Sequence, residues 1–85
     1  MSPIQELGRA RLKLRLPAWR VRFDRASSPS FLEVCEAYEL AWIGLDYWMR
    51  SQTPNSPAMV ADYRDLIASL ELDAKLFASQ DIDAT

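Results

Sequence analysis

The sequence predicts a mainly α-helical protein built on an antiparallel two-helix hairpin, with helices at about residues 30–51 and 56–79. Both segments space their apolar residues alternately by three and four, and turn-forming residues separate them. Of the 85 residues, 49% are hydrophobic and 26% are charged, a composition typical of one small folded domain. A basic arm at 1–29 precedes the hairpin and a short acidic tail at 80–85, which we expect to fray, follows it.

The arm alternates apolar with basic residues on both sides of Pro17. The apolar residues are even-numbered before this proline and odd-numbered after it, so one straight strand would place the two sets on opposite faces. We therefore predict an extended arm that is kinked at Pro17, or a hairpin that folds there. In either form a cationic surface results, made of Arg11, Lys13, Arg15, Arg20 and Arg22.

The first predicted helix begins near Ser28 or Ser30, which can cap it, with Pro29 in its first turn. Glu33 follows Ser30 by three residues, as in a capping box. The seam that follows has the heptad spacing of helices packed nearly parallel or antiparallel. It consists of Phe31, Cys35, Tyr38, Trp42, Leu45 and Met49.

The second predicted helix begins at Ser56 and Pro57, a strong signal for a helix N-terminus. Its seam repeats the spacing of the first and consists of Val60, Tyr63, Ile67, Leu70, Ala74 and Phe77. Two matched seams joined by a short connection predict that the helices pack against each other.

The first helix also has apolar residues away from its seam. Residues 40–49 hold a single charge, Asp46, and a helix that is apolar most of the way round is buried most of the way round. The arm or a second subunit could cover this face, and two hairpins could form a four-helix bundle. The predicted partner interface is Leu40, Ile43, Tyr47 and Trp48.

Charge is segregated along the chain. Residues 1–29 hold seven basic and two acidic residues, a net charge of +5, whereas residues 30–85 hold three basic and ten acidic residues, a net charge of −7. A basic arm of this kind can bind nucleic acid or a membrane surface. It can equally dock on the acidic body of its own chain or of a second copy, where Glu33, Glu36, Glu39, Asp62 and Asp65 offer an acidic face.

The composition argues against an enzyme. The chain has no histidine and one cysteine, Cys35, which we expect to be a small buried residue. These counts exclude triads built on histidine and a zinc site, and two glycines do not make a phosphate-binding loop. We predict no catalytic residues, no metal and no cofactor. Without a secretory signal or an apolar run long enough for a membrane span, we expect a soluble cytoplasmic protein with no transmembrane segment.

Three functions remain open. The first is a small non-enzymatic helical interaction module, an adaptor, accessory subunit or inhibitor that binds a second copy or another protein. The second is nucleic-acid binding, because RLKLRLP at 11–17, followed by two helices, resembles the strand of ribbon-helix-helix DNA-binding proteins. That resemblance implies that residues 9–25 act as a basic ribbon in the major groove. The third is peripheral membrane attachment through the arm.

Overall fold

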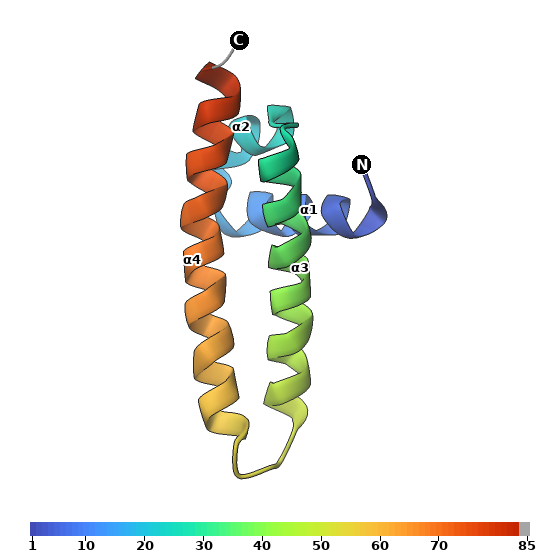
Figure 1. The fold of residues 1–85 in the computed structure, drawn as a ribbon, viewed down its shortest axis with the longest axis vertical. Coiled ribbons are helices and arrows are strands. Elements are labelled where there is room, and N and C mark those ends of the chain that lie inside the picture. The colour runs from blue at the N-terminus through green and yellow to red at the C-terminus, as the bar shows by residue number, and fades with distance from the viewer. Residues whose placement is uncertain (84–85) are drawn as a thin grey trace.

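The computed structural model describes residues 1–83, which form helices joined by short connections (Figure 1). Helix α1 spans Pro3–Arg15, a 3-10 turn spans Pro17–Trp19, and α2 spans Arg20–Arg25. Helix α3 spans Pro29–Arg50 and α4 spans Ser56–Asp83. The prediction of a mainly helical protein is confirmed.

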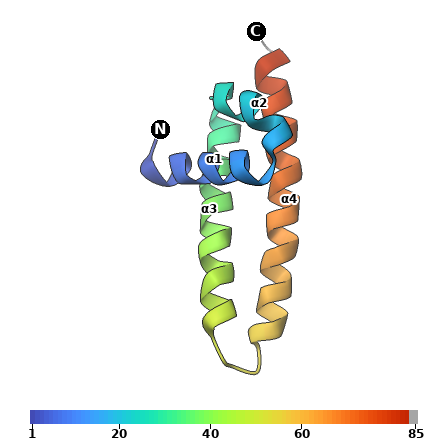
Figure 2. The same ribbon diagram turned by 180° about the vertical axis from the view of Figure 1, so that it is seen from behind.

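The two longest helices, α3 and α4, give the molecule its elongated shape of 49 by 22 by 20 Å. They lie side by side and run in opposite directions, joined by residues 51–55 (Figures 1 and 2). Ser28 caps α3, because its hydroxyl accepts a hydrogen bond from the N–H of Phe31. The buried side chains that the pair contributes to the core are Phe31, Val34, Cys35, Tyr38, Ala41, Leu45, Ile67, Leu70, Ala74 and Ala78.

The expectation of an extended or hairpin-like arm is wrong, because residues 3–15 are helical. Ser2 and Gln5 form a capping box in which each side chain accepts a hydrogen bond from the other residue's backbone N–H. Pro3 occupies the first turn, where a proline suits a helix. The alternating pattern was misleading because it included Leu14 and Val21, whose exposed fractions are 77% and 62%.

Helix α1 crosses α3 near the end at which α3 begins (Figure 2). The crossing point is Gly8, which is buried. A Cβ atom at this position would lie 1.8 Å from the carbonyl oxygen of Cys35, so only glycine allows the two backbones to approach this closely. Four residues further along α1, Leu12 is fully buried and adds α1 to the core.

The short helix α2 buries Phe23 and returns the chain to the start of α3. Arg9 of α1 holds its C-terminal end, because the guanidinium donates hydrogen bonds to the carbonyl oxygens of Phe23, Asp24 and Ala26. The same guanidinium lies 5.5 Å from the ring centre of Phe31, within the range of a cation–π interaction.

The C-terminal end of α4 lies against the start of α3. The carboxylate of Asp81 accepts hydrogen bonds from the backbone N–H groups of Ser27 and Ser28. Residues 80–83 of the expected tail continue α4, so the predicted end of this helix at residue 79 is too early. Residues 84–85 lie outside the described residues.

Candidate interaction surface

The predicted partner interface lies on α3 and is largely open to solvent. Leu40, Ile43 and Tyr47 follow one another by three and four residues and so share one face of the helix. Their exposed fractions are 51%, 54% and 63%. Trp48 is only half-buried, and its ring lies edge-on to that of Tyr47 with 5.2 Å between the ring centres. We call Leu40, Ile43 and Tyr47 the α3 stripe.

The basic residues predicted to form one cationic surface have different surroundings. Arg11 makes two hydrogen bonds to the carboxylate of Glu39, one from Nε at 2.9 Å and one from a terminal nitrogen at 3.2 Å. Glu39 is 6% exposed, so this member of the predicted acidic face is covered by the arm rather than solvated. A buried carboxylate needs such a partner, because an unpaired charge is costly to remove from water.

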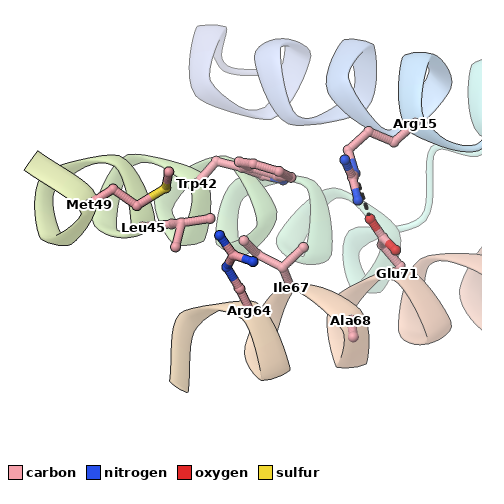
Figure 3. A pocket seen from close by; sticks show the side chains of 8 residues that line it. All are labelled: Arg15, Trp42, Leu45, Met49, Arg64, Ile67, Ala68 and Glu71. Carbon is pink, nitrogen blue, oxygen red and sulfur yellow. Dashed lines mark hydrogen bonds and ion pairs between the residues drawn. The ribbon is translucent and has the colours of Figure 1, made fainter. Parts of the chain in front are cut away.

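Arg15 extends from the end of α1 to α4, where it pairs with Glu71 at 3.0 Å (Figure 3). The hydroxyl of the buried Tyr38 donates a 2.6 Å hydrogen bond to the same carboxylate. Arg11 and Arg15 also lie 5.2 and 4.8 Å from the indole ring of Trp42. Hydrogen bonds to Glu39 and Glu71 raise the pKa values of the Arg11 and Arg15 guanidinium groups. These two cations hold α1 on the acidic body of its own chain.

The other three cations make no ion pair with α3 or α4 among the residues whose side chains the structure describes. Lys13 pairs with Asp24 at 2.9 Å, and this hydrogen bond lowers the pKa of the Asp24 carboxyl. Arg22 lies 5.0 Å from the ring centre of Trp19, and its guanidinium donates a 3.5 Å hydrogen bond to the hydroxyl of Ser79 on α4. Arg20 is exposed and makes no ion pair with any described residue. Part of the basic arm therefore stabilises the fold and part of it faces solvent.

Cys35 is fully buried, as expected, and burial raises the pKa of its thiol to about 11. A thiol with a raised pKa holds little of the thiolate that reacts with electrophiles or metals. Within residues 1–81, no three acidic, histidine or cysteine side chains come together in a way that could hold a metal ion. None of the helices in this part of the chain has an apolar stretch long enough to cross a membrane.

Comparison of the chain with models of known protein families, with curated protein sequences and with solved structures finds no match.

Sequence reasoning found only one of the two acidic residues that receive the arm. Charge segregation indicated that the arm could dock on its own chain, and Glu39 was among the acidic residues offered for this role, but Glu71 was not. Once residues 3–15 are recognised as a helix, Arg11 and Arg15 lie four residues apart on one face of it. Carboxylates on the helices that this face packs against are then the expected partners of both arginines. The capping residues Ser2 and Gln5 carried that signal.

Proposed function

We propose that this chain is a small non-enzymatic helical protein–protein interaction module whose binding surface is the α3 stripe, and that its first partner is a second copy of itself. The observation that carries the proposal is the exposure of Leu40, Ile43 and Tyr47 by more than half each. Large apolar side chains gathered on one helix face are typical of interaction sites. Tyrosine is also among the residues enriched at the centres of interfaces.

A second copy suits this surface because the α3 stripe lies on a long helix that is already paired with α4. When the stripes of two such pairs meet about a two-fold axis, the result is a four-helix bundle. The two α1 helices can stay in place in this arrangement, since Arg11 and Arg15 hold them through Glu39 and Glu71. The exposed cations of the arm, Arg20 among them, then lie outside the bundle core.

The ribbon route to nucleic acid has less support than the sequence suggested. Residues 9–15 are helical, whereas a major-groove ribbon requires paired strands. Arg11, Lys13 and Arg15, which the ribbon would use for phosphate contacts, are already paired with carboxylates.

Sedimentation equilibrium of the purified chain and two variants tests the proposal. We expect the wild type to dimerise at micromolar concentrations and Ile43→Asp to remain monomeric, because the carboxylate would be buried without a partner. The matched control is Leu72→Asp on α4, whose leucine is 66% exposed and lies off the stripe. It should dimerise like the wild type.

A wild-type chain that stays monomeric at high concentration would contradict dimerisation. If Leu72→Asp abolished association as fully as Ile43→Asp, the α3 stripe would not be the interface. Circular dichroism of all three proteins shows whether the helices are intact.

A further inference from the structure

A concave surface, separate from the α3 stripe, lies between α3 and α4 next to the C-terminal end of α1 (Figure 3). Its volume is about 380 Å³, near the lower end of the range for small-molecule sites. The lining residues come from three helices: Arg15, Trp42, Leu45, Met49, Arg64, Ile67, Ala68 and Glu71. We propose that this pocket binds a small amphiphilic carboxylate, such as a medium-chain aliphatic acid.

The apolar part of the pocket suits a short hydrocarbon chain. Leu45 and Ile67 form its inner wall and are 4% and 5% exposed. Trp42 covers one side, where the guanidinium groups of Arg11 and Arg15 hold its ring. These side chains are already ordered by the fold, so a ligand would bind without the cost of arranging them.

The charged part of the pocket selects an anion. Glu71 already accepts hydrogen bonds from Arg15 and from the hydroxyl of Tyr38, so its carboxylate does not need a further cation. Arg64, in contrast, makes no ion pair or hydrogen bond with any side chain in residues 1–81. Figure 3 shows its guanidinium directed into the pocket, beside Leu45 and Ile67.

A guanidinium group over an apolar wall fits a carboxylate at the end of a hydrocarbon chain. The planar group of Arg64 can donate two parallel hydrogen bonds to one carboxylate. The low-dielectric wall beside it strengthens that interaction relative to one in bulk water. A neutral alcohol of the same length would lose the charge interaction, and a quaternary ammonium ion would be repelled.

Two-dimensional ¹H–¹⁵N NMR of the full chain tests the proposal, with decanoate, decanol and decyltrimethylammonium as ligands below their micelle concentrations. We expect saturable shifts from decanoate at the pocket residues, with Ile67 and the indole N–H of Trp42 among them. Decanol should bind about tenfold more weakly, the factor that one charge-assisted hydrogen bond accounts for. The ammonium ion should cause no saturable shift.

Two variants assign the site, and a third is the control. Arg64→Gln should weaken decanoate binding about tenfold without weakening that of decanol. Ala68→Phe should abolish the binding of both, because Ala68 is exposed at the pocket wall and its enlargement fills the space without disturbing the core. Arg25→Gln removes the same charge from an exposed arginine on α2 and should bind decanoate like the wild type.

Three outcomes would overturn the proposal. The first is the absence of a saturable shift with decanoate. The second is equal affinity for decanoate and decanol, which would show that Arg64 does not select the anion. The third is a set of shifts centred on Leu40, Ile43 and Tyr47, which would mean that the amphiphile only adsorbs to the α3 stripe.

Discussion

Single residues determine how closely the helices of this protein approach. Gly8 brings α1 onto the backbone of α3 at Cys35, and Gly44 brings α3 onto the ring of Tyr63. What a new Cβ would meet differs between the two. At Gly8 it is a backbone carbonyl, whereas at Gly44 it is the outer end of a tyrosine side chain, 2.5 Å away.

Substitution of these glycines by alanine should therefore have unequal effects. In an exposed helix the change would stabilise by about 1 kcal/mol. For Gly8→Ala we expect a net loss of about 2–3 kcal/mol, because overpacking against a backbone must move a whole helix. For Gly44→Ala we expect a change of less than about 1 kcal/mol, since the Tyr63 ring can shift. Urea unfolding followed by circular dichroism measures both, and equal stabilities of the two variants would contradict the crossing at Gly8.

At the scale of the helix, α1 is held on α3 by both apolar and charged contacts. Leu12 packs into the core, and Arg11 pairs with Glu39. The Glu39 side chain is 8% exposed and that of Arg11 is 39% exposed, so the two partners lose different amounts of hydration. The carboxylate depends on the pair more than the guanidinium does.

A double-mutant cycle separates the two contributions. Arg11→Met should destabilise by about 2 kcal/mol, because it leaves the Glu39 carboxylate buried without a partner, a cost that partial exposure of the pair reduces. Adding Glu39→Met should restore most of the loss, since two apolar side chains can fill the same space. Thermal or urea unfolding of the wild type, both single variants and the double variant gives the coupling free energy. If the double variant is less stable than Arg11→Met, the pair contributes by packing rather than by charge.

Helix seams and caps could be predicted from the sequence where the local signals agreed. Ser28 with Pro29 and Ser56 with Pro57 placed the start of each long helix within one residue of its observed position. The N-terminal segment was harder to predict because its apolar residues fit a strand pattern and its helix signal was a capping box two residues from the chain start. In the structure α1 relies on Gly8 and Leu12 for packing, and the exposed Leu14 contributes nothing to it.

The candidate sites were predictable to different degrees. The α3 stripe could be proposed from the sequence because its excess apolar residues lie within a single helix, where spacing alone defines a face. The pocket at Arg64 was not found, because its residues come from three helices and their meeting depends on the path of α1. Cys35 and Tyr38 were placed in the core by their seam positions, and both are fully buried.

For the molecule as a whole, burial of two ionisable groups links stability to alkaline pH. Desolvation by burial raises the pKa of Cys35 to about 11 and that of Tyr38 to about 12. The folded chain therefore keeps both protons at a pH where the unfolded chain has begun to lose them. Deprotonation then favours the unfolded state. The stability that these two protonated groups contribute is therefore fully present below pH 9 and is lost as the pH rises toward 12.

We expect the free energy of unfolding to fall by on the order of 3 kcal/mol between pH 8 and pH 11. Urea unfolding at a series of pH values measures this change. The variant Cys35→Ala with Tyr38→Phe should show a clearly smaller fall, because it removes both groups and leaves Glu71 paired with Arg15. An equally steep fall in this variant would place the alkaline sensitivity in other groups.

The three hydrogen bonds from Arg9 to the end of α2 mean that α1 and α2 cannot be treated as independent segments. Among the described residues none has a positive φ, so the chain leaves α2 without the left-handed glycine that commonly ends a helix. The carbonyl groups at the end of α2 are instead satisfied by Arg9, which precedes them in the sequence by 14, 15 and 17 residues. Deletion of residues 1–15 would therefore remove the group that caps the C-terminal end of α2, although the sequence of α2 itself would be unchanged.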